Sequence, residues 1–291
     1  MKIIKYLIQA FIIYTLFLII KIIGLNFSRA IFSRIFILFG SFFKSDEIIN
    51  KNLQIVYNNL DIEDKKKIKQ QMWSNYGKVF VEYMFLKKFR ENLFSDHYIQ
   101  IKGIENLEGI FRNKQKAIFV SGHFANFELM SMELTKLGVN LATIYRPLNN
   151  FFINPLMESL RKKYICHNQI KKGFSGIREA VNFLKNNTSI ALMLDQRLSE
   201  GEKINFFSQP ALTTTLPAQL ALKFKCPIIP IFISRTPKNH FIMEIMEPIN
   251  FNNYEKETYK IDTTTELNKI LEKMIIRSSG QWIWTHDRWK S

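Results

Sequence analysis

The second half of the chain alternates short apolar runs with amphipathic segments. Each apolar run is four to six residues long and is bounded by polar or turn residues: 117–120, 141–145, 189–194, 228–233 and 241–246. Such runs are typical of buried strands. Three helices are predicted between and after these runs. The first covers 127–137, with Gly138 as its C-cap, and the last lies around 267–275. The second is indicated by the apolar face that Ile177, Ala180, Val181 and Leu184 would form. Strand–helix alternation predicts an α/β fold with a mostly parallel central sheet and helices on both faces.

Residues 1–25 are expected to form an N-terminal membrane-anchor helix. Lys2 and Lys5 precede an almost unbroken apolar run from Tyr6 to Ile20. About twenty residues are needed to cross the hydrocarbon core, and this run reaches that length only if Lys21 extends to the interface. A cleaved signal peptide is the alternative, but no small-x-small cleavage site follows the apolar run. The sequence therefore favours an uncleaved anchor.

The depth of this anchor stays open. Lys2 and Lys5 favour an N-terminus on the cytoplasmic side, although Arg29 and Arg34 lie beyond the apolar run. The stretch 27–43 alternates Phe and Ile with these two arginines, as a basic amphipathic surface helix does. A helix lying in the interface keeps both of its ends cytoplasmic, whereas a spanning helix does not.

The rest of the chain has no Pro-, Gly- or Ser-rich linker that would divide it. Asp61 starts a predicted helix with acidic residues at the positive end of its dipole, and this helix runs to about Leu86. We therefore expect an anchor at 1–25, a helical lead-in at 26–100 and an α/β catalytic body at 101–291.

Composition adds a preference for acidic partners. The chain is 47% hydrophobic, and its formal net charge is +16. Such a charge suits an anionic bilayer, an acidic carrier protein, a phosphorylated substrate or nucleic acid. An AT-rich coding sequence produces a similar excess of Lys, Ile and Asn, so the charge alone decides little. Cys166 and Cys226 have no CxxC spacing, which indicates neither a disulfide framework nor a zinc site.

Three predicted strands end in chemically useful side chains. The first leads into His123, the second into Arg146, and the third into Asp195 and Gln196. Ligands of open α/β sheets bind beyond the carboxyl ends of the strands. A base, a cation and a carboxylate are thus delivered to one edge of the sheet.

His123 begins an HxxxxE sequence that ends at Glu128. We expect Glu128, in the first turn of a helix, to bind the imidazole, fix its tautomer and stabilise its charged form. The other ring nitrogen then accepts a proton from an attacking hydroxyl, and free N–H groups at the helix start hold an oxyanion. The alternative is a histidine that caps a helix and a glutamate that favours its dipole, which is the commoner meaning of a bare HxxxxE.

Four segments, taken in order along the chain, make the sequence resemble a known protein family. They are the HxxxxE block 121–128, Ile144-Tyr-Arg-Pro-Leu-Asn149, Asp195-Gln196 with 206–230, and the C-terminal 281–290. Together with the apolar N-terminus, these blocks make nearly the whole chain resemble the lipid A biosynthesis acyltransferases, the lauroyl/myristoyl transferases. Phe207-Ser-Gln-Pro210 departs from that family, which commonly has glycine after the phenylalanine pair.

The resemblance implies an O-acyltransferase on the cytoplasmic side of the bacterial inner membrane. Its donor would be an acyl carrier protein thioester, and its acceptor the 3-hydroxyl of a hydroxyacyl chain on a lipid A precursor of the Kdo-lipid IVA type. His123 and Glu128 would be catalytic, Arg146, Asp195 and Gln196 would bind substrate, and no metal or nucleotide cofactor would be needed. Arg146 would hold phosphate or carboxylate, or pair with Asp195; Asp195 alternatively supports the dyad.

Two other functions are compatible with parts of this pattern. A phospholipid or other glycolipid acyltransferase would use the same dyad on another acceptor. A basic membrane- or polyanion-binding protein with an inactive dyad would show salt-dependent binding and no transfer. The sequence contains no recognisable nucleic-acid motif, so no nucleic-acid partner is expected, and it does not define the oligomeric state.

Overall fold

The computed structural model describes residues 2–94, 98–250 and 257–290. Its centre is a seven-stranded sheet in the order β1-β9-β8-β2-β5-β3-β4. The strands are β1 (Ile99–Lys102), β2 (Ile118–Ser121), β3 (Leu141–Tyr145), β4 (Asn168–Lys171), β5 (Ser189–Met193), β8 (Ile228–Arg235) and β9 (Phe241–Ile245). A separate antiparallel hairpin contains β6 (Glu202–Phe206) and β7 (Gln209–Thr213).

The sheet is mostly parallel, as predicted, and all five expected strands are present. β2 pairs in parallel with β5 and β8, and β3 pairs in parallel with β4 and β5. β9 is antiparallel to β8 and parallel to β1. The register aligns Ser121 of β2 with Met193 of β5. His123 and Asp195 each lie two residues beyond that pair, so the register brings them level at the carboxyl edge.

Helices cover both faces of the sheet. They are α6 (Glu108–Asn113), α7 (Glu128–Lys136), α8 (Asn154–Leu160), α9 (Phe174–Lys185), α10 (Leu216–Phe224) and α11 (Tyr259–Arg277). Given the strand order, the right-handed crossovers usual between parallel strands place α7 and α8 on one face and α9 and α10 on the other. α11 contacts both α10 and β8. The predicted fold class is therefore confirmed.

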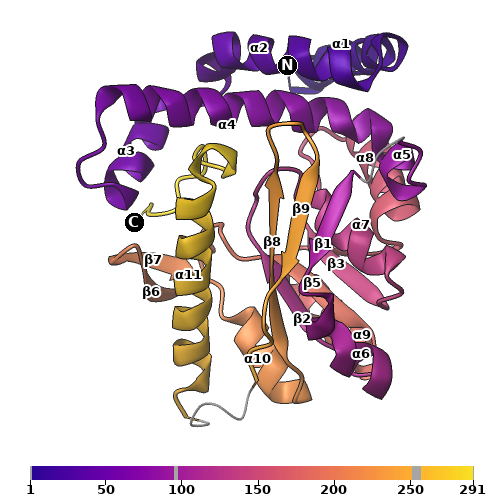
Figure 1. The fold of residues 1–291 in the computed structure, drawn as a ribbon, viewed down its shortest axis with the longest axis vertical. Helices are drawn as coiled ribbons and strands as arrows, with labels where there is room; N and C mark the ends of the chain where they lie inside the picture. Colours follow the sequence, from indigo (N-terminus) through magenta and orange to yellow (C-terminus); the bar gives the residue numbers. More distant parts are fainter. Residues whose placement is uncertain (1, 95–97, 251–256, 291) are drawn as a thin grey trace.

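A helical layer crosses the carboxyl edge of the sheet (Figure 1). It consists of α1 (Lys2–Ile23), α2 (Leu25–Phe43), α3 (Asp46–Val56), α4 (Ile62–Glu82) and α5 (Leu86–Arg90). Asp61 caps α4, as predicted, by accepting a hydrogen bond from the backbone N–H of Asp64. α4 lies between the sheet edge and the α1–α2 pair. The edge that bears His123 therefore lies beneath the apolar N-terminal helices.

α2 packs very closely on α4. A Cβ atom added to Gly77 of α4 would lie 2.3 Å from the carbonyl oxygen of Phe32 in α2. At the other end of the contact, a Cβ added to Gly40 would lie 2.2 Å from the indole of Trp73. Gly77 thus permits a close approach of the two helix backbones, and Gly40 makes room for the Trp73 ring.

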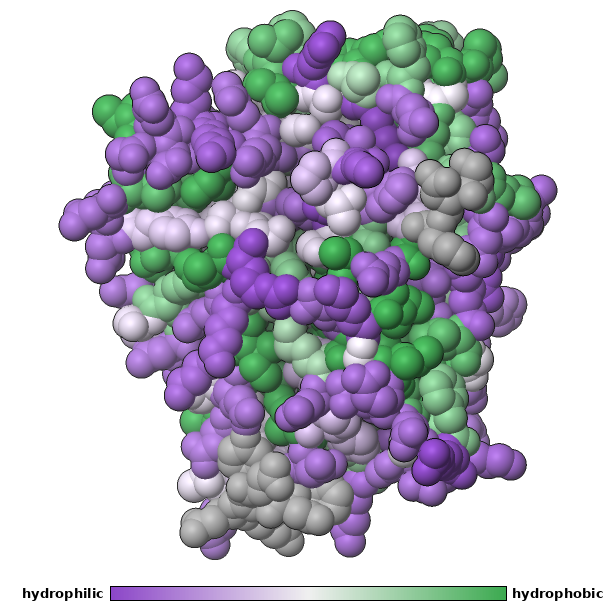
Figure 2. Space-filling view, in the orientation of Figure 1, coloured by the Kyte–Doolittle hydropathy of each residue, from purple (hydrophilic) through white to green (hydrophobic). Residues whose placement is uncertain are grey.

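α1 lies along the body of the protein. Its inward stripe contains Tyr6, Ala10, Ile13, Phe17 and Ile20, at alternating spacings of four and three residues. The stripe is fixed at its start by the Asn150 amide, which donates to the carbonyl of Tyr6 at 2.9 Å. The opposite face leaves large apolar side chains exposed, and Figure 2 shows apolar residues gathered over α1 and α2.

Arg29 does not belong to a basic membrane-facing surface, contrary to the expectation for residues 27–43. Its side chain is 1% exposed and is ion-paired with the fully buried Glu82 of α4. Arg34 is exposed, as expected. α2 is therefore a helix with Arg29 in the protein interior and an outer face that is mostly apolar but carries Arg34.

Candidate active site

Asp195 holds His123 at two points. The Nδ1 atom of His123 lies 2.7 Å from Oδ1 of Asp195, and the backbone N–H of His123 donates to Oδ2 at 2.7 Å. The Nε1–H of Trp282 donates to the same Oδ2 at 2.9 Å. Both oxygens of a carboxylate with no exposed side-chain surface are thus engaged. This arrangement fixes the imidazole ring relative to the sheet edge.

The electrostatics keep Asp195 ionised. Burial opposes its charge, but the His123 imidazole and the hydrogen bonds from His123 and Trp282 outweigh burial and hold the pKa of Asp195 below its ordinary value. An ionised acceptor at Nδ1 selects the tautomer with the proton on Nδ1. Nε2 of His123 then has a free lone pair, and no described residue donates a hydrogen bond to it.

The His123 ring remains partly accessible. Its side chain is 17% exposed, and Phe127 packs edge-on against the ring with centroids 4.5 Å apart. A fixed, partly exposed imidazole backed by a buried carboxylate matches the base and orienting group of a catalytic triad. The arrangement is able to take a proton from a hydroxyl that approaches Nε2.

Glu128 makes its contacts elsewhere. Its Oε1 atom accepts a hydrogen bond from the hydroxyl of Tyr83. The same oxygen accepts from Nε of Arg161 at 2.8 Å and lies 2.7 Å from Nη2 of Arg161. It forms no hydrogen bond with His123. The structure therefore pairs His123 with Asp195, and the expected His123–Glu128 hydrogen bond is replaced by a Tyr83–Glu128–Arg161 cluster.

This second cluster is also largely buried. The side chains of Arg161 and Glu128 are 11% and 10% exposed. Burial opposes the charge of Arg161, but Glu128 and Tyr83 outweigh it and raise the pKa of the guanidinium. Burial and the neighbouring Glu128 charge raise the pKa of Tyr83, which therefore remains a hydrogen-bond donor. The Nη1 atom of Arg161 is buried and has no partner among the described residues.

The loop between His123 and α7 presents unused backbone donors. Ala125 adopts a left-handed conformation with φ 45°, and its N–H donates to the carbonyl of Gln281 at 3.1 Å. The N–H groups of Asn126 and Phe127 have no acceptor in the described part of the chain. These are the free amides expected at a helix start, and they lie beside the His123 turn in sequence.

The other two predicted substrate residues occupy more open positions. Arg146 follows β3, is exposed and forms no ion pair with any described residue, so its suggested pairing with Asp195 does not occur. Gln196 is half-buried beside Asp195. The backbone N–H of Lys172 donates to the carbonyl of Tyr145 at 2.8 Å. Tyr145 precedes Arg146, so this hydrogen bond brings the two cations near each other, and burial and then the charge of Arg146 lower the pKa of Lys172.

Three residues that contact Glu128 or Asp195 were not predicted from the sequence as parts of the site. Tyr83 and Arg161 lie 45 and 33 residues from Glu128, and neither belongs to a recognisable motif. Trp282 is 1% exposed, so it packs in the core, and its indole N–H also donates a hydrogen bond to Asp195. The described residues contain no cluster of His, Cys, Asp and Glu suited to a metal ion.

Comparison with known proteins places this geometry in a family. The model of the bacterial lipid A biosynthesis acyltransferase family matches residues 1–291. The chain belongs to this family. The resemblance inferred from the four sequence segments is therefore confirmed. The family assignment makes this protein an acyltransferase.

Two curated relatives support the assignment. The lipid A biosynthesis palmitoleoyltransferase of Escherichia coli (strain K12) is 24% identical over 255 residues, which cover 85% of this acyltransferase and 79% of the relative. The lipid A biosynthesis acyltransferase of Shigella flexneri gives the same values. Among solved structures, the 1-acyl-sn-glycerophosphate acyltransferase of Thermotoga maritima aligns over 95% of this chain and 97% of its own, with a TM-score of 0.39 and 18% identity.

Proposed function

We propose that this acyltransferase moves a fatty acyl chain from an acyl carrier protein thioester to the 3-hydroxyl of a hydroxyacyl chain on a lipid A precursor of the Kdo-lipid IVA type. The observation that carries the proposal is the His123–Asp195 pair, whose 2.7 Å contact leaves Nε2 available to a hydroxyl. Its location beneath the apolar α1–α2 layer suits an acceptor that resides in a membrane.

In the proposed reaction His123 is the general base. Nε2 removes the hydroxyl proton as the acceptor oxygen attacks the thioester carbonyl, and Asp195 stabilises the resulting imidazolium. Collapse of the tetrahedral intermediate breaks the carbon–sulfur bond and expels the carrier thiolate, which receives the proton from His123. The products are an ester on the acceptor and a free carrier thiol, and the chain supplies every proton transfer without a metal or nucleotide cofactor.

Glu128 has an indirect role in this proposal. Glu128 binds Arg161 and Tyr83 at the start of α7. The free amides of Asn126 and Phe127, just before this helix, are the proposed oxyanion donors. One such donor is typically worth about 10²–10³ in rate. Glu128 thus assists His123 by maintaining the loop and the helix start, rather than by binding the imidazole.

Arg146 is the proposed contact for the acceptor's phosphate or carboxylate. It is exposed at the carboxyl end of β3, on the edge of the sheet that bears His123, and Lys172 lies close to it. Gln196 is proposed to donate or accept a hydrogen bond nearby. The net charge of +16 favours the approach of an acidic carrier protein and a phosphorylated glycolipid.

We further propose attachment to the cytoplasmic face of the inner membrane through α1 and α2. Both helices are long and apolar enough to span a bilayer, and only 17% of the apolar stretch of α1 and 28% of that of α2 is buried in the protein. However, α1 is held against the body from Tyr6 to Ile20. This lateral packing favours a helix that lies in the interface over one that crosses the membrane.

Product mass tests the function directly. Purified protein is incubated with carrier thioesters of several acyl chain lengths and with either a tetra-acylated lipid A precursor or a lysophospholipid. One added acyl chain on the lipid A precursor, absent with His123→Ala, is expected. Transfer to the lysophospholipid alone would replace the proposed acceptor, and full activity in His123→Ala would overturn the base assignment.

A further inference from the structure

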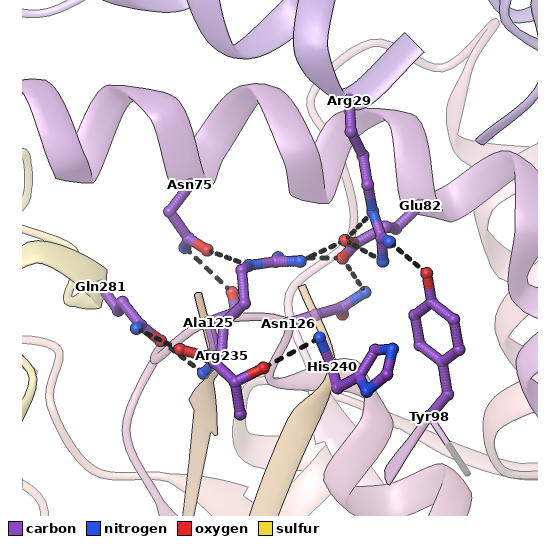
Figure 3. A network of polar contacts seen from close by, with 10 residues as sticks. Arg29, Asn75, Glu82, Tyr98, Ala125, Asn126, Arg235, His240 and Gln281 are labelled. Carbon is purple, nitrogen blue, oxygen red and sulfur yellow. Dashed lines mark hydrogen bonds and ion pairs between the residues drawn. The ribbon is translucent and has the colours of Figure 1, made fainter. Parts of the chain in front are cut away.

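A buried charge cluster lies between the membrane-facing helices and the catalytic loop (Figure 3). Glu82, the last residue of α4, is its centre, with no exposed side-chain surface. Arg29 of α2 and Arg235 of β8 bind this one carboxylate, and their side chains are 1% and 4% exposed. Three elements that are distant in the sequence therefore converge on Glu82.

Each arginine is oriented by further contacts. Nε of Arg29 donates to Oε1 of Glu82 at 2.7 Å, and its Nη1 donates to the Tyr98 hydroxyl at 2.7 Å. Nη1 and Nη2 of Arg235 bind the two oxygens of Glu82, with the Nη2 contact at 3.0 Å. The backbone of Arg235 exchanges two hydrogen bonds with the Gln281 amide, at 2.7 and 2.9 Å.

The cluster reaches the catalytic loop through two asparagines. The Asn126 amide donates to Oε2 of Glu82 at 2.9 Å. The Asn75 amide donates to the carbonyl of Ala125 at 3.2 Å and accepts from Nε of Arg235 at 3.1 Å. Ala125 and Asn126 stand two and three residues after His123, so the left-handed turn of this loop is held from the side of α4.

The charge balance indicates that this cluster fixes geometry. Burial opposes the ionisation of Glu82, but the charges of Arg235 and Arg29 outweigh it and keep its pKa below the ordinary value. A buried ion pair often stabilises a protein no better than apolar residues of similar volume. The apolar contacts and close glycine approaches already join α2 to α4, so the cluster is not required merely to pack them.

We infer that Glu82 is a positioning residue that joins the membrane-facing helix α2 to the catalytic loop through Arg29 and Asn126. Arg29 holds Glu82 from the α2 side, and Glu82 holds Asn126 on the other side of α4. This inference rests on the proposed role of His123 as the base, because the loop carries His123 and the candidate oxyanion amides. The residues that it adds, Glu82 and Arg29, do not touch the substrate, and of Asn126 it uses the side chain rather than the backbone amide.

Two substitutions test the link from its two ends. Asn126→Ala removes the loop contact and keeps the Arg29–Glu82–Arg235 charges, and Arg29→Met removes the α2 contact but keeps an apolar stem. A displacement of about 1 Å at a catalytic group is able to cost about 10²-fold in rate. We expect kcat to fall roughly 10- to 100-fold in Asn126→Ala and less in Arg29→Met, with KM for donor and acceptor unchanged.

Asn268→Ala is the matched control. Asn268 is also 1% exposed, and its amide donates one hydrogen bond, to the carbonyl of Asn205 at 2.9 Å. It lies in α11 and contacts no part of the catalytic loop in the described hydrogen bonds. We expect its thermal unfolding temperature to fall as in Asn126→Ala while kcat stays at the wild-type value.

A second measurement needs no acceptor lipid. The rate at which a histidine-specific reagent modifies His123, read by mass spectrometry of the folded protein, should change in Asn126→Ala and Arg29→Met and not in Asn268→Ala. Unchanged modification rates and unchanged kcat in both test variants would overturn the inference. An effect in Asn126→Ala alone would overturn the link to α2. If the wild type acylates no lipid A precursor, the proposed acceptor fails, while the modification rates still decide the positioning role.

Discussion

The carboxylate of Asp195 binds both the ring and the backbone of His123, with Oδ1 2.7 Å from Nδ1 and Oδ2 2.7 Å from the backbone nitrogen. The parallel register of β2 and β5 explains this pair. Ser121 and Met193, the last residues of the two strands, lie opposite each other, and His123 and Asp195 each follow two residues later. His123, the proposed base, and Asp195 are therefore positioned by the ends of two paired strands, and sites built on strands are more precise than sites built on loops.

Asp195→Asn is expected to lower kcat by about 10²–10⁴. The asparagine amide is nearly the same size, but its NH2 group is able to donate to Nδ1. The imidazole then carries its proton on Nε2, where a lone pair is needed. Steady-state acyl transfer by Asp195→Asn, compared with His123→Ala, measures the effect. Wild-type kcat in a folded Asp195→Asn protein would show that Asp195 does not orient the base.

Glu128 and Arg161 are expected to behave as one unit. Removing one partner of a buried ion pair leaves an uncompensated charge and typically costs about 3–5 kcal/mol. Glu128→Ala and Arg161→Ala should each destabilise the protein strongly, and Glu128→Ala/Arg161→Ala by much less than the sum of the two. Urea unfolding in a double-mutant cycle measures this coupling. Additive effects would contradict the pairing, whereas a direct His123–Glu128 dyad would leave Arg161 energetically independent.

The sequence predicted the location of the candidate site better than the hydrogen-bond partner of His123. Strand ends placed His123 and Asp195 at one edge, because apolar runs and their polar ends are local features. The HxxxxE spacing suggested Glu128 as the partner, but the turn at Ala125 leads Glu128 to Tyr83 and Arg161 instead. Those two residues come from distant segments, and no local pattern specifies such a contact.

The missed strands have a similar explanation. β1 and β4 are four residues long and only partly buried, so they lack a continuous apolar run. In the β6–β7 hairpin, Phe207 and Ser208 have φ values of 51° and 58°. Two-residue hairpin turns with positive φ are usually marked by Asn or Gly. Phe-Ser at the turn gives no such signal.

Acid should destabilise the protein through Glu82 and Asp195. Both have pKa values held below their ordinary 4.5 and 3.8, for Glu82 by Arg235 and Arg29 and for Asp195 by His123 and Trp282. A depressed native pKa contributes stability that is complete above the unfolded pKa and is lost as pH falls through the native pKa. Urea midpoints should therefore fall as pH decreases below about 4.5.

Glu82→Gln isolates one part of this dependence. The amide is uncharged at every pH, so the variant should lose stability at neutral pH, where Arg29 and Arg235 lack their counter-ion, and should show a shallower decline in acid. Asp287→Asn is a control, because Asp287 pairs with Lys51 at 3.6 Å on a partly exposed surface. Parallel pH curves for Glu82→Gln and the wild type would contradict the role assigned to Glu82.

The orientation of α1 predicts which side of the membrane its two ends occupy. Tyr6 and Ile20 both lie on the stripe that packs against the body, so a helix held along this whole stripe has both ends on one side. Lys2→Cys and Lys21→Cys should therefore both react with a membrane-impermeant thiol reagent in inverted inner-membrane vesicles, where the cytoplasmic face is outward. The native Cys166 and Cys226 are 3% and 1% exposed, so the unsubstituted protein should give a low background. Labelling at only one of the two introduced cysteines would show that α1 spans the bilayer and separates from the body as it does so.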